Sequence, residues 1–216
     1  MNPALAGVAL AVVLGAVVAA SARNARTAVL GLIVAMIGAT FLAEPLPDSI
    51  GLAARLVGAV LAGYLLWIAG RDSTARTGGS RLGWPAEVLV AAAAAAVGYG
   101  SHGLGAPATG PVLAQAAGFA IAALAVAPLV NGRDTLRIGL GLNLLMSGAV
   151  LVRIGLGGTP QNLEQLAIAG LVAMLGGATA AVAVAARSDG TDGYDLAVGP
   201  GTRVRKLPDA HPVDPR

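Results

Sequence analysis

The chain of 216 residues is too apolar for an ordinary soluble domain, with 56% hydrophobic residues, 12% charged residues and a mean hydropathy of +0.76. Soluble domains carry roughly 25% charged residues and about 45–50% apolar ones. The formal net charge is +3, and the basic residues are dispersed rather than gathered in one patch, which gives no evidence for nucleic-acid binding. Composition therefore predicts an all-α, polytopic membrane protein in a lipid bilayer.

Seven apolar runs have about the 20 residues that a helix needs to cross the hydrocarbon core. In chain order these runs cover 3–21, 27–45, 50–70, 85–102, 112–130, 135–156 and 164–186. Turn and charge clusters separate the runs. The fourth run is the weakest, because Gly98, Gly100 and Gly103 blur its end. We expect about seven transmembrane helices, with six as the alternative.

The basic residues predict how the spans are oriented. Apart from Arg55 and Arg153, the 14 lysines and arginines lie in loops on one side of the membrane or after the last run. By the positive-inside rule that side is cytoplasmic, which puts the amino terminus outside and the carboxyl terminus in the cytoplasm. Residues 187–216 combine Gly, Pro and Asp and are expected to form a disordered cytoplasmic tail.

The chain resembles itself at an offset of 110 residues. Residues 23–65 align with 133–175 without gaps and share 12 identities in 43 positions. Runs one to three and five to seven also cross the membrane in the same directions, which favours a parallel duplication over an inverted repeat. The expected organisation is a three-helix module (1–70), a connecting loop and fourth helix (71–111), a second three-helix module (112–186) and the tail (187–216).

Ionisable side chains are expected near the outer ends of the spans and not at their middles. We expect Arg55 and Arg153 to extend to the outer headgroups, with Glu44 or Glu164 as ion-pair partners. An ion pathway is the alternative, because an ionisable group inside a membrane often marks a functional site.

Three uncharged polar residues are expected within the spans. Asn143 and Ser147 lie one turn apart on one helix face, where they would hydrogen-bond to a neighbouring helix or line a water path. The same structural interpretation applies to Gln115. The chain has no cysteine, and Gly139-Leu140-Gly141 lies in an apolar run without a preceding strand, so it does not indicate a dinucleotide site. We therefore expect no catalytic residue, metal or cofactor of the chain's own.

The carboxyl-terminal half resembles a known family of membrane subunits. The residues that carry this resemblance are Arg133-Asp134, Ile138-Gly139-Leu140, Arg187, Gly190-Thr191 and Asp195-Leu196. They are similar to the three-helix K-type small subunit of bacterial complex I and to its relative in multisubunit cation/proton antiporters. By length and helix count, and by Pro107, Thr109, Gly110, Pro160 and Glu164, the whole chain resembles component E of the hydrogenase-4 and formate hydrogenlyase complexes.

The chain departs from this family at the residues associated with proton transfer. K-type subunits carry glutamates within the membrane, whereas no acidic residue lies between Asp134 and Glu164 here, and Gly141 or Met146 takes the equivalent position. The resemblance therefore implies a non-catalytic subunit of a bacterial cell-membrane complex, with antiporter-like and redox subunits as partners. An autonomous small-solute transporter or channel and a generic membrane scaffold are the alternatives.

Overall fold

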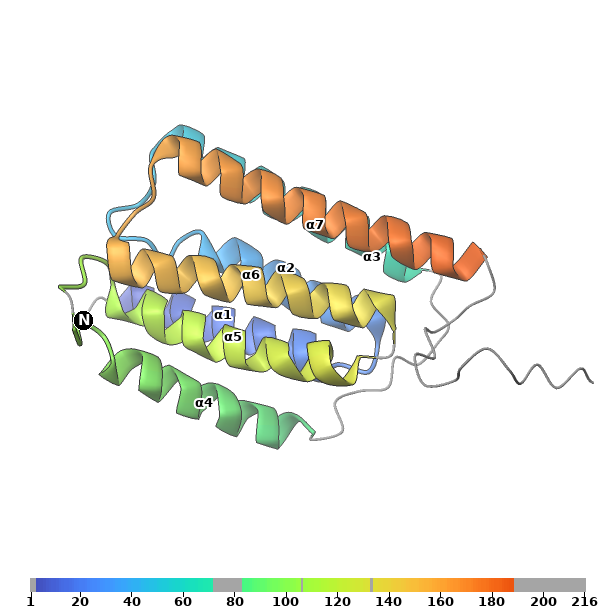
Figure 1. Cartoon of the computed structure of the whole chain (residues 1–216), viewed down its shortest axis with the longest axis horizontal. Coiled ribbons are helices and arrows are strands. Elements are labelled where there is room, and N and C mark those ends of the chain that lie inside the picture. Colours follow the sequence, from blue (N-terminus) through green and yellow to red (C-terminus); the bar gives the residue numbers. More distant parts are fainter. Residues whose placement is uncertain (1–2, 72–82, 106, 133, 189–216) are drawn as a thin grey trace, which may run out of the picture.

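The computed structural model describes residues 3–71, 83–105, 107–132 and 134–188. These residues form seven α-helices and no strand (Figure 1): α1 (Pro3–Ser21), α2 (Ala25–Ala39), α3 (Ser49–Arg71), α4 (Trp84–Gly100), α5 (Val112–Asn131), α6 (Thr135–Gly157) and α7 (Asn162–Ser188). The predicted all-α class is confirmed. The predicted disordered tail, 187–216, begins too early, because α7 ends at Ser188, and residues 189–216 lie outside the described residues.

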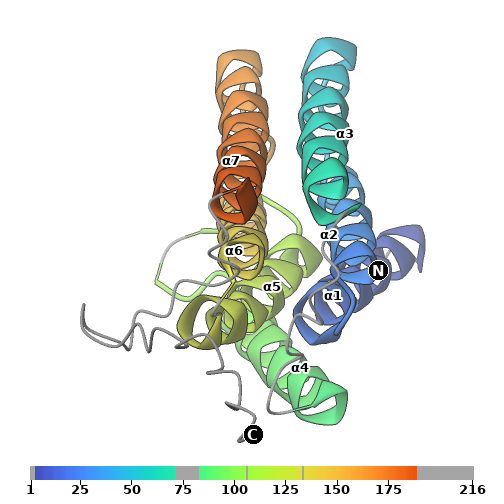
Figure 2. The ribbon, with the colours of Figure 1, turned by 90° about the vertical axis from the view of Figure 1, so that its right-hand side faces the viewer.

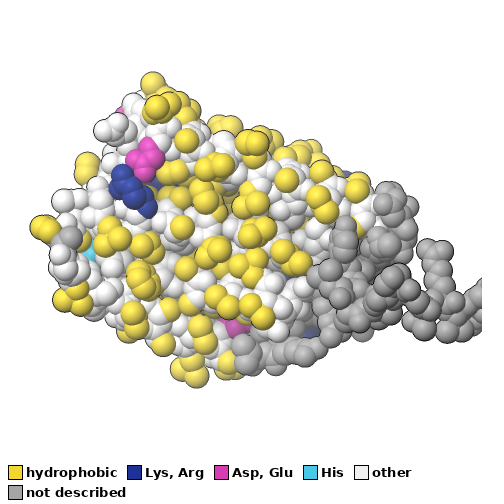
Figure 3. Space-filling model, viewed as in Figure 1, with side chains coloured by type: hydrophobic (Ala, Val, Ile, Leu, Met, Phe, Trp, Pro, Cys, Tyr) yellow, Lys and Arg dark blue, Asp and Glu magenta, His cyan; other side chains and the backbone are white. Residues whose placement is uncertain are grey.

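The helices fit a membrane protein that crosses the bilayer several times. Five of them, α1, α3, α5, α6 and α7, are long and apolar enough to cross a membrane, whereas α2 and α4 are apolar but shorter, with 15 and 17 residues. Hydrophobic side chains are spread along the surface of the bundle, and charged ones are few (Figure 3). The protein is therefore a multi-pass membrane protein.

The predicted second span, 27–45, is wrong at its carboxyl end, because α2 ends at Ala39. Proline disfavours helical backbone in the preceding residue, and inside a helix its ring clashes with the carbonyl four residues earlier. Pro45 and Pro47 therefore keep the helix from continuing through residues 41–46. At 1.5 Å per residue, α2 is about 22 Å long, shorter than a hydrocarbon core of about 30 Å.

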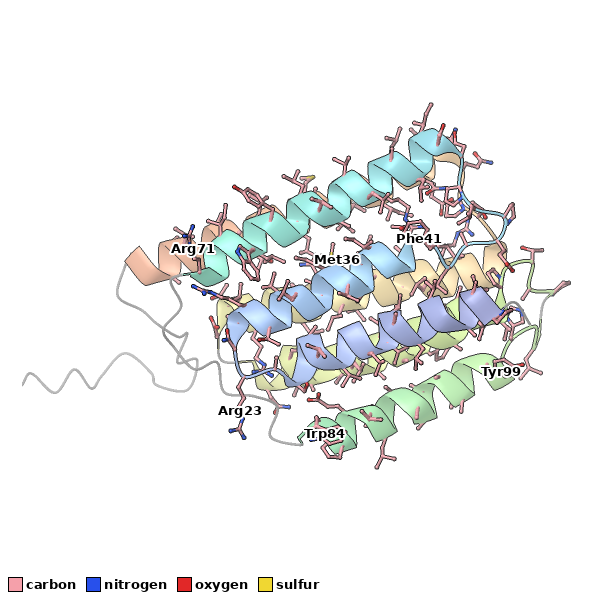
Figure 4. All side chains as sticks on the ribbon, turned by 180° about the vertical axis from the view of Figure 1, so that it is seen from behind. Arg23, Met36, Phe41, Arg71, Trp84 and Tyr99 are labelled. Carbon is pink, nitrogen blue, oxygen red and sulfur yellow. The ribbon has the colours of Figure 1, made fainter. Side chains whose placement is uncertain are left out.

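The two ends of the bundle differ in composition. Arg23, Arg26, Arg71 and Arg137 lie near one end, here called the basic end. Pro45, Pro47, Pro111 and Pro160 lie near the opposite end, here called the proline end. Trp84 is at the basic end, and Phe41 and Tyr99 are at the proline end (Figure 4).

The helices form two columns that face each other (Figure 2). One column contains α1, α2 and α3, and the other contains α5, α6 and α7. Helix α1 contacts α5, α2 contacts α6, and α3 contacts α7, while α4 packs against α5 and α1.

Glycines bring the helices within each column into backbone contact. A Cβ added at Gly15 of α1 would lie 2.8 Å from the carbonyl oxygen of Gly31 on α2. A Cβ added at Gly118 of α5 would lie 2.8 Å from the carbonyl oxygen of Gly148 on α6. Such contacts are typical of membrane helices, which associate through close packing because lipid is as apolar as their side chains.

The two columns also share a contact at the repeat offset. A Cβ on Gly38 would meet Val12, and a Cβ on Gly148 would meet Ala122. Gly38 lies 110 positions before Gly148, and Val12 lies 110 positions before Ala122. This correspondence agrees with a parallel duplication, although the predicted module boundaries stay a prediction.

Replacing Gly118 by alanine tests the backbone contact between α5 and α6. The added Cβ would lie 2.7 Å from the Val152 nitrogen, so whole helices must separate, and we expect a loss of about 1–3 kcal/mol of stability. Thermal unfolding of the purified protein in detergent measures this loss. Gly170→Ala on α7 is the matched control, because no atom lies within 4 Å of its added Cβ. Equal unfolding temperatures for the two variants would contradict the packing argument.

Candidate functional site

A small polar cavity lies between α2, α3, α6 and α7. Its volume is about 30 Å³, and its polar lining residues are Thr40, Arg55 and Ser147 among apolar neighbours. A site of roughly 10–15 Å³ by this measure already holds one water molecule, so the cavity has room for about two. At this cavity the buried charge of Arg55 meets open space.

Arg55 faces the interior, which corrects the prediction that it extends to the outer headgroups. The residue is 6% exposed, and its Nη1 has no hydrogen-bond partner among the described residues. Helical periodicity explains this orientation, because Arg55 shares a face of α3 with Gly51, Gly58 and Ala62, all of which are buried. The arginine is thus on the packed face of its helix and not on the lipid face.

The carboxyl end of α2 lies at the same cavity as the Arg55 charge. Ala39 and Thr40 line the same cavity as Arg55. The end of a helix leaves carbonyl groups without intrahelical partners and carries about half a negative charge. Leu42 and Ala43 after the helix are fully buried, as non-helical backbone at membrane depth must be. The early end of α2 therefore places a negative dipole beside a buried cation.

Asn143 and Ser147 form hydrogen bonds within α6 and not across to another helix. Asn143 Nδ2 donates to the Gly139 carbonyl at 2.9 Å, and Ser147 Oγ donates to the Asn143 carbonyl at 2.8 Å. Ser147 lines the cavity, as the water-path interpretation requires. Asn143 is 1% exposed, and its Oδ1 has no partner among the described residues.

The hydroxyl groups in the cavity accept hydrogen bonds, and Arg55 donates them. Thr40 Oγ1 donates its proton to the Ile37 carbonyl, as Ser147 does to that of Asn143, so both oxygens offer only lone pairs to the cavity. One unpartnered donor and two acceptors suit a bound water molecule. The fixed positive charge also disfavours the passage of cations between these helices.

Gln115 lies away from this cavity, near the proline end of α4. Its Oε1 is 2.7 Å from His102 Nδ1, and its Nε2 donates to Ser101 Oγ at 3.2 Å. Because a carbonyl oxygen only accepts, His102 carries the proton on Nδ1. Gln115 thus connects α5 to the residues that follow α4.

One of the predicted ion pairs forms at the proline end. Arg153 Nη2 lies 3.1 Å from Glu164 Oε2, and both side chains are exposed. Glu44 is exposed in the segment after α2. Nearby, Asn162 donates to Asp48 Oδ2 at 2.8 Å, and Thr159 donates to the Pro45 carbonyl, so the segments before α3 and α7 are joined.

Sequence reasoning missed Gln165, although the repeat contained a signal for it. Gln165 is 1% exposed, its Nε2 donates to the Pro160 carbonyl at 3.1 Å, and its Oε1 has no partner among the described residues. At the offset of 110 residues, Gln165 corresponds to Arg55. The repeat therefore aligns a buried polar group of α3 with one of α7.

A second buried charge cluster lies near the basic end. Arg137 of α6 is 9% exposed and donates through Nη2 to the Ala20 carbonyl at 2.6 Å. Glu87, in the first turn of α4, is 2% exposed and interacts electrostatically with Arg137. The cluster joins α1, α4 and α6. Sequence analysis did not single out these two residues, because their burial depends on contacts between helices distant in the chain.

In comparisons with known proteins, no protein-family model, curated protein or solved structure matches the chain.

Replacing Arg55 by methionine tests whether its buried charge stabilises the fold. Removing a buried charge in favour of an apolar side chain of similar length is often neutral or stabilising by about 1–4 kcal/mol. We therefore expect an unchanged or higher unfolding temperature in detergent. The control is Arg153→Met, which removes an exposed ion pair worth about 0–1 kcal/mol. A larger drop for Arg55→Met than for the control would mean that Arg55 is a net stabilising contact.

A double-mutant cycle tests the Glu87–Arg137 interaction. Arg137→Gln removes a positive charge that interacts with the buried carboxylate of Glu87, so we expect a loss of stability. Adding Glu87→Gln should restore part of that loss. Unfolding temperatures of the two single variants and the double variant measure the coupling, and strictly additive losses would show that the two charges do not interact.

Proposed function

We propose that this protein is a non-catalytic membrane subunit of a complex I-like or hydrogenase-like assembly that couples redox chemistry to ion movement. The observation that carries this proposal is the size and charge of its buried polar cavity. A volume of about 30 Å³ holds water but no organic solute, and Arg55 makes the cavity positive. Such an interior suits a subunit that holds neighbouring chains together better than one that carries a solute by itself.

The resemblance to component E and to K-type small subunits suggests the partners. They would be antiporter-like subunits and redox subunits, bound through apolar helix faces within a bacterial cell membrane. In this arrangement the basic end is cytoplasmic and the proline end is outside, as the positive-inside rule predicts. Since α6 carries no acidic residue, any proton path would belong to the partners.

An autonomous transporter or channel is a second candidate, and one observation favours it. Transporters use interrupted helices near their binding sites, and α2 stops at Ala39 beside the cavity. Two other places where a helix could be interrupted, Gly98–Gly100 and Pro128, do not support this candidate. Gly98 and Gly100 lie in the last turn of α4, and α5 continues past Pro128 to Asn131.

Purification from the native host separates the two candidates. The full chain, tagged at its carboxyl terminus, is extracted in mild detergent, and the recovered proteins are identified and quantified by mass spectrometry. We expect antiporter-like and iron–sulfur or nickel–iron subunits in a constant ratio to the tagged chain. A tagged multi-pass protein from the same membrane serves as the control.

Recovery of the intact chain alone at full yield would contradict the subunit proposal. A rise in unfolding temperature with one class of small solute would then support the transporter, because a ligand of the folded state stabilises that state.

A further inference from the structure

An apolar groove runs between α1, α4 and α5, on the far side of the bundle from Arg55. Its volume is about 330 Å³, and every side chain that lines it is alanine, valine or leucine. It extends along α1 from Ala9 to Val17 and along α4 from Val88 to Ala95. At 1.5 Å per residue, the groove is roughly 11–12 Å long. Helices α1 and α4, which form its walls, are seen together in Figure 4.

The groove stays open because α4 is fixed at both ends. Near the proline end, a Cβ on Gly98 would lie 3.0 Å from the Ala116 Cα of α5, so the two backbones already touch. Near the basic end, Glu87 is buried and interacts with Arg137 of α6. Between these points, the short side chains of Ala92 and Ala95 line the groove. The contacts at the two ends of α4 thus hold it in place along the groove.

The lining and length of the groove suit a hydrocarbon chain. The groove is roughly 11–12 Å long, and the side chains along it are all apolar, as a methylene chain requires. Water is a poor occupant, because the lining offers it no polar side chain, and an empty groove would lose dispersion contacts along its whole wall.

The basic end supplies a site for a phosphate at one mouth of the groove. Val17 and Val88 lie four residues from the ends of α1 and α4, a distance of about 6 Å along each helix. Beyond them, Arg23 and Trp84 are exposed at the same end of the bundle (Figure 4). Guanidinium groups bind phosphate well, and tryptophan favours the headgroup region.

We propose that this groove binds one acyl chain of an anionic phospholipid, with the lipid phosphate beside Arg23. The lipid would fill the space that α4 leaves against α1 and would be part of the folded protein. This inference does not depend on the proposed assembly, because the groove lies within a single chain.

The test compares a variant that fills the groove with a matched variant on the same helix. Ala92→Phe with Ala95→Leu places larger side chains in the groove, whereas Ala93→Phe with Ala96→Leu places the same side chains outside its lining. Each full-length protein is purified in mild detergent, and its phospholipid is quantified by mass spectrometry. We expect about one tightly held phospholipid per chain in the wild type and the control, and at least a fivefold loss in the groove-filling variant.

Adding back defined lipids tests the headgroup. Phosphatidylglycerol should raise the unfolding temperature of the delipidated wild type more than phosphatidylcholine does, and Arg23→Gln should abolish that difference. Equal lipid retention by the groove-filling and control variants, both folded by circular dichroism, would overturn the acyl-chain site. Equal stabilisation of the wild type by the two lipids would overturn the role of Arg23.

Discussion

Direct backbone contact between neighbouring helices is the constraint on which the rest of this structure depends. Gly15 meets Gly31 between α1 and α2, and Gly118 meets Gly148 between α5 and α6. In a bilayer, burial of apolar side chains gives little driving force, so close packing at small residues decides which helices pair. These contacts fix the first two helices of each column. The third helices of the columns, α3 and α7, then pack against each other. The cavity and its polar groups then follow from that meeting.

Arginines lie at the carboxyl ends of all three helices of the first column. Arg137 donates to Ala20 in the last turn of α1, Arg55 shares a cavity with Ala39 and Thr40 at the end of α2, and Arg26 Nη2 donates to the carbonyl of Arg71 at the end of α3. Helix carboxyl ends are partly negative and leave carbonyl groups unpaired. Arg137 and Arg26 thus each satisfy a carbonyl group at a helix end and connect two helices, whereas Arg55 lies beside the end of α2 with its Nη1 unpartnered among the described residues.

The sequence predicts the helices well because span length and turn residues are local properties. Six of the seven predicted spans agree with the helices to within two residues at each end, and the Arg153–Glu164 pair joins side chains near one interface. The end of α2 was misplaced because an apolar run conceals the effect of Pro45 and Pro47 on preceding residues. Arg55 was misplaced because nearness to a helix end does not reveal which face packs, whereas the glycines at positions 51 and 58 mark that face.

The two columns differ in charge at a buried pair of positions that the repeat aligns in α3 and α7. Arg55 is charged, and Gln165, its counterpart, is neutral. A Cβ on Gly51, one turn before Arg55, would lie 3.1 Å from the Gln165 side-chain amide, so this amide packs against the start of α3. A second arginine there would put two buried positive charges near each other, and their repulsion in a medium of low dielectric constant would push α3 and α7 apart. The neutral glutamine at position 165 avoids this repulsion, so α3 and α7 can pack against each other beside the buried charge of Arg55.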